Sequence, residues 1–125
     1  YDFIHSGDES KRAYNNKTVR DTEMAQGMDR ASGDYNDFWA GRDYLNDMGP
    51  MKAALLMSHG FNDWNVMPEH SYRIYDAARA KGIPAKIYYH QNGHGGPPPF
   101  SMMNRWFTRY LHGVENGVEE GPKAY

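Results

Sequence analysis

Hydrophobic and polar positions alternate in blocks between Met51 and Gly96. A short apolar run, Ala53 to Met57, is followed by a polar loop that extends to Val66. A second apolar run, Ala85 to Tyr89, is also followed by a polar loop. Continuous apolar runs of this length are typical of strands buried on both faces of a parallel sheet, although periodicity alone does not separate them from a buried helix. The pattern therefore predicts two strands, each ending in a loop.

Two helices are predicted beside these strands. The first covers Pro68 to Lys81, because proline suits the first helical position and a glycine follows the last turn. The second begins at a capping Ser101 and ends at His112, with methionine and aromatic side chains at the spacing of a buried helix face. The order strand, helix, strand, helix implies right-handed crossovers and a parallel sheet. Two strands do not make a stable sheet alone, so we expect a part of a larger α/β domain.

The first 50 residues have no sustained period and are rich in polar residues, glycine and tyrosine. One or two helical turns are predicted from Thr22 to Met28, and a helix is expected to start at a capping Asp34, with Phe38, Trp39 and Tyr44 buried. We interpret residues 1–50 as an irregular or helical cap or crossover segment, with a flexible end as the alternative. Residues 51–113 are the β-α-β-α part, and residues 114–125 an exit linker towards a further domain.

Composition narrows the classes of function. The chain has 125 residues, a net charge of -2 and no cysteine. A charge this close to neutral gives no electrostatic reason to expect a nucleic acid or an anionic membrane as partner. No apolar run approaches the roughly 18 residues of a membrane helix, and cysteine catalysis and disulfides are excluded. We expect a soluble protein, cytoplasmic or secreted, that could form a homo-oligomer.

An acid and a histidine follow the two predicted strands. Asp63 lies in the first loop and His94 in the second, and ligands of open α/β sheets meet the chain at the carboxyl ends of the strands. In α/β-hydrolases the catalytic residues follow one another in the order serine, acid, histidine. Asp63 and His94 are therefore predicted to be the last two members of a catalytic triad, in which the acid orients and the histidine moves the proton.

The nucleophile of such a triad is not predicted in this chain. No Gly-x-Ser-x-Gly motif is present, and no serine stands on a strand-to-helix elbow before Asp63. Ser32 comes nearest, but no buried strand precedes it. The serine is therefore expected on another segment, and the chain alone is predicted to be inactive.

Other interpretations of the same residues stay open at this point. Asp63 and His94 could be an ordinary loop acid and a surface histidine, or could bind a metal together with His59, although no usual metal motif is present. His59-Gly60 is similar to an esterase oxyanion loop but has the wrong position, so His59 is interpreted as a packing or hydrogen-bonding residue. Trp64 and Asn65 flank the acid and are candidates for the substrate pocket, with Trp64 alternatively in the core.

Four motifs resemble one known family. Asp29 to Trp39 and Arg42 to Leu45 resemble the segment before the acid in X-prolyl dipeptidyl-peptidases. His59 to Val66 resembles that family's acid loop, in which the aspartate is the triad acid, and Gly93-His94 matches its catalytic histidine. Arg105 to Val118 is similar to the helix and exit that lead into its C-terminal jelly-roll domain.

The resemblance implies the C-terminal part of an α/β-hydrolase catalytic domain. The activity expected from it is a serine peptidase that releases Xaa-Pro dipeptides from peptide N-termini, without metal or organic cofactor. Its partners would be a peptide with proline at the second position and the serine-bearing remainder of the same enzyme. A related cocaine-esterase-like acyl hydrolase is the first alternative. The second is a catalytically silent binding module on a hydrolase-derived fold, which the missing serine favours.

Overall fold

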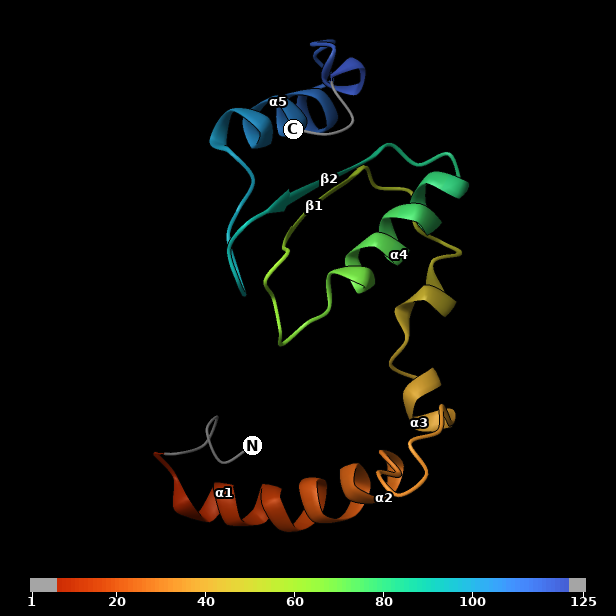
Figure 1. Ribbon diagram of the computed structural model, residues 1–125, viewed down its shortest axis with the longest axis vertical. Coiled ribbons are helices and arrows are strands. Elements are labelled where there is room, and N and C mark those ends of the chain that lie inside the picture. Colours follow the sequence, from red (N-terminus) through yellow and green to blue (C-terminus); the bar gives the residue numbers. More distant parts are fainter. Residues whose placement is uncertain (1–6, 122–125) are drawn as a thin grey trace. The chain divides into compact units, whose positions relative to one another are not determined.

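The computed structural model describes residues 7–121, and the chain divides between residues 46 and 47 into two compact units. The first unit begins with an unbroken helical run of α1 (Glu9–Asn15), the π-type η1 (Asn16–Met24) and α2 (Ala25–Gly27), as Figure 1 shows. Asp8 caps its start by accepting a hydrogen bond from the Lys11 amide at 3.1 Å. Residues 9–27 are thus helical, where the sequence pattern indicated only the last turns.

A second short helix, α3 (Asp37–Ala40), packs on the end of this run within the first unit. Its cap is Asn36 and not Asp34, because the Asn36 side chain accepts hydrogen bonds from the Phe38 and Trp39 amides and also donates to the Gly27 carbonyl. A Cβ atom on Gly27 would overlap the Phe38 ring, so glycine allows this close packing.

Two of the aromatic side chains expected to be buried in this segment are not. Trp39 is 37% exposed and Tyr44, in the 3-10 helix η2 (Tyr44–Asp47), is 74% exposed. The prediction of their burial is therefore wrong for the described residues, and Phe38 alone of the three is half-buried.

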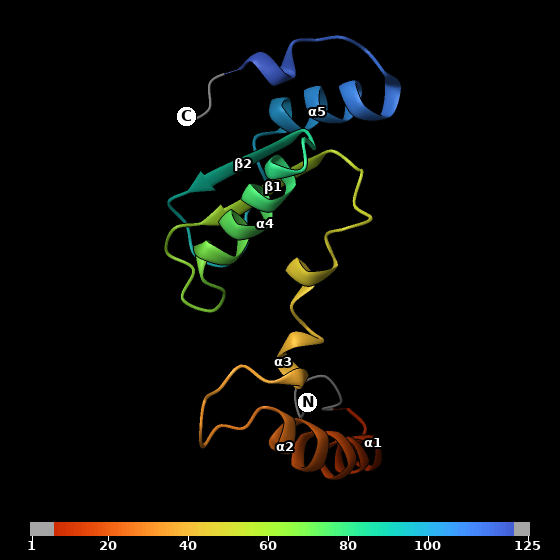
Figure 2. The same cartoon turned by 90° about the vertical axis from the view of Figure 1, so that its right-hand side faces the viewer.

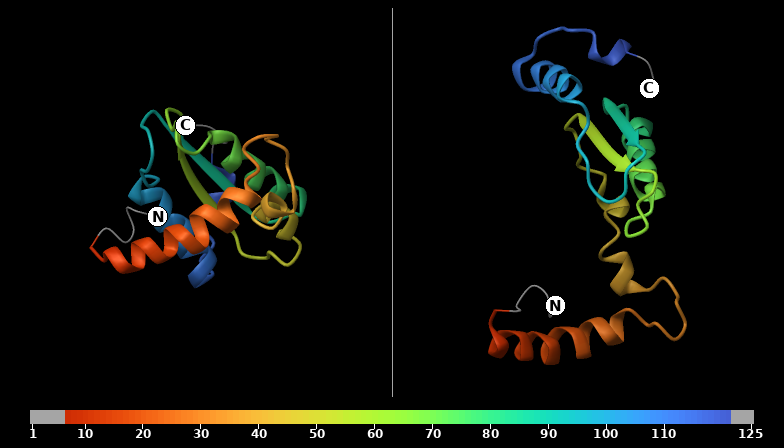
Figure 3. Two further views of the ribbon diagram at one scale, coloured as in Figure 1. Left: turned by 90° about the horizontal axis from the view of Figure 1, so that it is seen from below. Right: turned by 60° about the vertical axis from the view of Figure 1, so that its left-hand side comes forward.

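The second unit is built on two parallel strands, β1 (Leu55–Gly60) and β2 (Ala85–His90), which confirms the predicted pairing. Their register runs from Leu55 opposite Ala85 to Gly60 opposite His90. Figure 3 shows the strands side by side. β1 continues three residues beyond the predicted apolar run, because the polar side chains of Ser58 and His59 find hydrogen-bond partners beside the sheet.

Helices lie on opposite faces of this strand pair, as Figures 1 and 2 show. α4 (Pro68–Ala80) has proline in its first turn and packs on both strands, with Ser71 and Ala78 buried. Tyr72, predicted on the buried face, is instead 52% exposed. This layering of helices on parallel strands is compatible with the expected α/β class.

α5 (Phe100–His112) ends as predicted, at Gly113 with a left-handed φ of 70°. Its cap residue is Pro99, without a side-chain hydrogen bond, so Ser101 is not the cap. Trp106 is 3% exposed, whereas Phe107 and Leu111 are 50% and 73% exposed. The apolar stripe of this helix is therefore only partly buried within the chain.

The segment after α5 folds back on that helix. Val118, at the start of the 3-10 helix η3 (Val118–Glu120), is 3% exposed, and the Arg109 Nε donates to Glu119 at 2.6 Å. The first part of the predicted exit linker is thus ordered, and residues 122–125 of that linker lie outside the described residues. Among residues 7–121, no helix combines the length and the apolarity needed to cross a membrane.

Candidate active site

The loops that follow β1 and β2 are joined by their backbones. The Phe61 amide donates to the His90 carbonyl at 2.8 Å, and the Asn62 amide donates to the Asn92 carbonyl at 3.2 Å. The Asn62 side chain also donates to the Gln91 carbonyl. These bonds continue the strand pairing past the end of the sheet, so the loop that bears Asp63 and the loop that bears His94 are held together.

Gly60 makes this close approach of the two loops sterically allowed. It is the last residue of β1 and is buried. A Cβ atom at this position would overlap the carbonyl oxygens of Asn92 and Gly93. Backbone atoms cannot swing aside as a side chain can, so only glycine fits here without moving the second loop.

Asp63 is buried and its carboxylate accepts several hydrogen bonds. Its side chain is 4% exposed. Oδ1 accepts from the Asn65 amide at 2.9 Å and from the Val66 amide at 3.0 Å. Oδ2 accepts from His94 Nδ1, also at 2.9 Å. The bond from the Val66 amide is the main reason that the Asp63 pKa falls from 3.8 to about 2, against the opposing effect of burial and with help from His94. The acid is therefore ionised at neutral pH.

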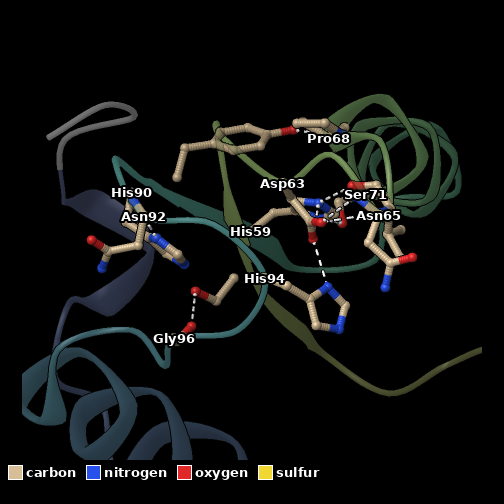
Figure 4. A network of polar contacts seen from close by, with 12 residues as sticks. His59, Asp63, Asn65, Pro68, Ser71, His90, Asn92, His94 and Gly96 are labelled. Atoms are coloured by element: carbon tan, nitrogen blue, oxygen red, sulfur yellow. Dashed lines mark hydrogen bonds and ion pairs between the residues drawn. The ribbon is translucent and has the colours of Figure 1, made fainter.

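His94 bridges this buried acid and the surface. Its side chain is 63% exposed, and its Nδ1 faces the carboxylate of Asp63. A carboxylate only accepts hydrogen bonds, so Nδ1 carries the proton and Nε2 of the neutral ring is the basic nitrogen. Figure 4 shows Nε2 on the side of the ring away from Asp63. The ring is thus oriented to accept a proton from outside this unit.

A second histidine lies behind the acid. His59 of β1 is buried, with its Nδ1 at 2.6 Å from the Ser71 hydroxyl and its Nε2 at 2.8 Å from the Val66 carbonyl. The same Nε2 is 3.3 Å from Asp63 Oδ2. The sequence interpretation of His59 as a hydrogen-bonding residue is confirmed, although the pattern gave no sign that its ring would meet the acid.

A pocket of about 260 Å³ opens beside the acid and the histidine. Its lining includes Ser58, Asp63, His90 and His94. Trp64 and Asn65 are not among its lining residues. Trp64 is 91% exposed, and the backbone amide of Asn65 donates a hydrogen bond to Asp63. Trp64 is therefore not a core residue, and contact of these two residues with a substrate stays a prediction.

No serine in the part of the chain from residue 7 to residue 121 is hydrogen-bonded to His94. Ser58 donates to the Gly96 carbonyl at 2.8 Å, Ser71 is paired with His59, and Ser32 binds Asp29 in the first unit. Ser6 lies outside the described residues. Within the same described range, no group of three or more histidine, aspartate or glutamate side chains is arranged to hold a metal ion.

Comparison with known proteins identifies the family. A sequence profile described as X-Pro dipeptidyl-peptidase (S15 family) matches residues 3–96. The chain belongs to this family. The match includes both Asp63 and His94 and confirms the resemblance seen in the sequence motifs.

Relatives of this chain are much longer than the chain itself. A protein of Rhodopirellula baltica, whose name assigns it to the Xaa-Pro dipeptidyl-peptidases, is 61% identical over the whole chain, which covers 20% of that relative. The Xaa-Pro dipeptidyl-peptidase of Lactiplantibacillus plantarum is 37% identical over 78% of the chain and 13% of its own length. That of Lactobacillus delbrueckii subsp. lactis is 33% identical over 92% of the chain and 15% of its own length. The chain thus spans a fifth or less of these relatives.

Proposed function

We propose that the chain is the C-terminal part of the catalytic domain of an α/β-hydrolase peptidase. In this proposal residues 1–50 are a cap or crossover segment, residues 51–113 complete the parallel sheet, and residues 114–125 lead towards a further domain. Membership of the S15 family and the parallel strand pair with a helix on each face support this assignment.

Asp63 and His94 are the acid and the general base of a Ser-His-Asp mechanism. The single observation that carries this assignment is the 2.9 Å hydrogen bond from His94 Nδ1 to Asp63 Oδ2. It fixes the tautomer in which Nε2 is free to accept a proton, as the base of such a mechanism requires. The buried, ionised carboxylate also stabilises the imidazolium that forms when the proton arrives.

The reaction sequence follows from these roles. His94 Nε2 takes the proton from a serine hydroxyl as that oxygen attacks the scissile carbonyl, and the protonated ring then gives the proton to the departing amine. A water molecule is activated in the same way and hydrolyses the acyl-enzyme. The serine and the oxyanion donors come from the remainder of the same enzyme, and the mechanism uses no metal or organic cofactor.

The substrates are peptides with proline at the second position, from which the enzyme releases Xaa-Pro dipeptides. The names of the relatives support this specificity, since the three described above all carry the name Xaa-Pro dipeptidyl-peptidase. A cocaine-esterase-like acyl hydrolase would share the acid and the histidine and differ in substrate.

The test uses a complete enzyme that contains this chain together with the serine-bearing segment. Cleavage of an Xaa-Pro anilide and of a simple acyl ester would be measured for the wild type, for His94→Ala and for the exposed control His70→Ala. Anilide cleavage that His94→Ala abolishes and His70→Ala preserves is expected. Ester cleavage alone would favour the acyl hydrolase, and cleavage of neither substrate would favour a binding module.

A further inference from the structure

Asp63 Oδ2 lies between two imidazole rings with very different exposure. His94 Nδ1 approaches it at 2.9 Å and His59 Nε2 at 3.3 Å. The His94 side chain is 63% exposed, whereas the His59 side chain is 8% exposed. Figure 4 shows the carboxylate of Asp63 between the two rings. The mechanism above uses the outer ring and leaves the inner one without a role.

The hydrogen-bond partners of His59 determine its tautomer. Nε2 faces the Val66 carbonyl and the Asp63 carboxylate, which both accept hydrogen bonds, so this nitrogen carries a proton and donates. Nδ1 faces the Ser71 hydroxyl at 2.6 Å, and a hydroxyl can donate to this nitrogen or accept from it. The ring is thus a buried donor to the Val66 carbonyl, with Asp63 Oδ2 3.3 Å from the same nitrogen, and Ser71 anchors the other side of the ring to α4.

The inner ring also connects the acid loop to the rigid part of the fold. His59 belongs to β1 and Ser71 to α4, while Asp63 and Val66 belong to the loop between these elements. Nε2 therefore contacts the loop at two points, one on the main chain and one on the carboxylate. Groups that touch a reacting group only through a neighbour commonly fix its orientation in this way.

We propose that His59 is a positioning residue for the acid, and that Ser71 holds the His59 ring in the orientation in which it acts. In this arrangement Oδ1 is held by two backbone amides, and His59 Nε2–H, bonded to the Val66 carbonyl, lies 3.3 Å from Oδ2. The carboxylate then has one orientation, and Oδ2 is directed at His94. The inference rests on the proposed roles of Asp63 and His94 and adds the group that keeps them aligned.

The kinetic experiment compares His59→Leu with His59→Gln in the complete enzyme. Leucine removes the donor, whereas the glutamine amide places an N–H near the position of Nε2. His59→Leu is expected to lower kcat about 10- to 100-fold with KM unchanged, the range typical for removal of such supporting partners, and His59→Gln to recover most of that loss. An unchanged kcat in His59→Leu, a change in KM alone, or a His59→Gln enzyme as slow as His59→Leu would overturn the proposal.

Two further measurements keep the inference testable if His59→Leu does not fold. Nitrogen-15 NMR of the wild type should find His59 as the Nε2–H tautomer, and an Nδ1–H tautomer would overturn the proposal. Ser71→Ala leaves both acceptors of Nε2–H in place, so the Nε2–H tautomer should persist. The Nδ1 signal should move because its hydroxyl partner is lost, and kcat should fall because the ring loses its anchor on α4. A Ser71→Ala enzyme with the wild-type His59 spectrum would contradict the role of Ser71.

The outcomes separate this inference from the proposed function. If the wild type cleaves the anilide, His94→Ala does not, and His59→Leu matches the wild type, the proposed function stands and the positioning role fails. If the wild type cleaves nothing, the proposed function fails. Proton NMR then still tests the positioning role, through the downfield signal of the Nδ1–H that His94 donates to Asp63. This signal should be lost in His59→Leu and kept in His70→Ala.

Discussion

At the scale of single residues, the candidate site depends on one carboxylate whose two oxygens have separate tasks. Oδ1 of Asp63 accepts two backbone amides and so fixes the local loop, whereas Oδ2 faces imidazole nitrogens. An amide side chain at this position would be a near-isostere that places an N–H group where an acceptor is needed. The consequences for activity and for stability are distinct.

Replacement of Asp63 by asparagine is expected to lower kcat of the complete enzyme by roughly 10⁴, as the same change does in the serine-protease triad. The reason is the loss of the tautomer that leaves His94 Nε2 free to accept a proton. Steady-state kinetics with an Xaa-Pro anilide measure this loss. Asp76→Asn, an exposed change on α4, is the matched control. Near-normal turnover in Asp63→Asn would contradict the assignment of the acid.

The ionisation of Asp63 also predicts a pH dependence of stability. Its pKa is lowered from 3.8 to about 2, chiefly by the Val66 amide, so the carboxylate stabilises the folded state above the unfolded pKa. That contribution is lost as the pH falls from about 4 to about 2. The free energy of unfolding, measured by denaturant titration over this range, should therefore fall more steeply in the wild type than in Asp63→Asn. Parallel curves for the two proteins would argue against the depressed pKa.

At the scale of the elements, the site is made by the ends of two paired strands. His59 and Gly60 belong to β1, Asp63 lies in the loop after β1, and His94 lies in the loop after β2. Backbone hydrogen bonds from Phe61 and Asn62 fix the separation between the two loops. The geometry of the acid and the histidine is therefore a consequence of strand pairing rather than of their own contact alone.

The substitution Gly60→Ala tests this dependence. Its methyl group would overlap the carbonyl oxygens of Asn92 and Gly93, and the loop with His94 would have to move away from Asp63. A loss of about 1–3 kcal/mol in the free energy of unfolding and a marked fall in kcat are expected, as for other overpacked sites. Gly49→Ala is the control, since a Cβ atom there meets no neighbour within 4 Å. A Gly60→Ala enzyme that is as stable and active as Gly49→Ala would contradict the argument.

The sequence predicted the elements where local signals agreed with the tertiary structure. The helices around Pro68 and before Gly113 and the parallel strands were read correctly, because apolar runs and helix-ending residues mark them. The end of β1 was missed because Ser58 and His59 are polar yet bonded across the fold. The sequence predicts the cap of α3 at Asp34, whereas the structure has it at Asn36, since both residue types suit a cap and only the backbone distinguishes them.

The candidate site was only partly visible in the sequence. The prediction that Asp63 and His94 meet agrees with the structure, because both follow strands that proved to be neighbours. The approach of His59 to the acid could not be predicted from the sequence, because it depends on the turn in which the Asp63 amide donates to the Gly60 carbonyl. Its contact with Ser71 could not be predicted either, since that contact depends on how α4 packs on β1.

At the scale of the whole molecule, the proposed mechanism takes its acid and base from this chain and its nucleophile from another segment. None of the serines among residues 7–121 is hydrogen-bonded to His94, and the related proteins extend far beyond the aligned segment. The exposed apolar side chains of Phe107 and Leu111 on α5 fit the proposal that the chain is part of a larger enzyme.

A serine-directed phosphonate tests whether the nucleophilic serine lies on another segment. In the complete enzyme, the reagent is expected to abolish Xaa-Pro cleavage and to modify one serine outside residues 1–125, because the triad order places the nucleophile before the acid. Peptide mapping by mass spectrometry locates the modified residue. His94→Ala should react slowly and His70→Ala at the normal rate. Modification of Ser32 or Ser58 would contradict the proposal that the nucleophile lies on another segment.

The way Asp63 is held has a consequence for how this loop can diverge in evolution. Its Oδ1 is bound by the main-chain amides of residues 65 and 66, which every amino acid except proline provides. The side chains of Trp64 and Asn65 are exposed and take no part in those bonds. The hold on Asp63 therefore places no demand on these two side chains, whereas proline at residue 65 or 66 would remove a bond to the acid and any side chain at Gly60 would displace the second loop.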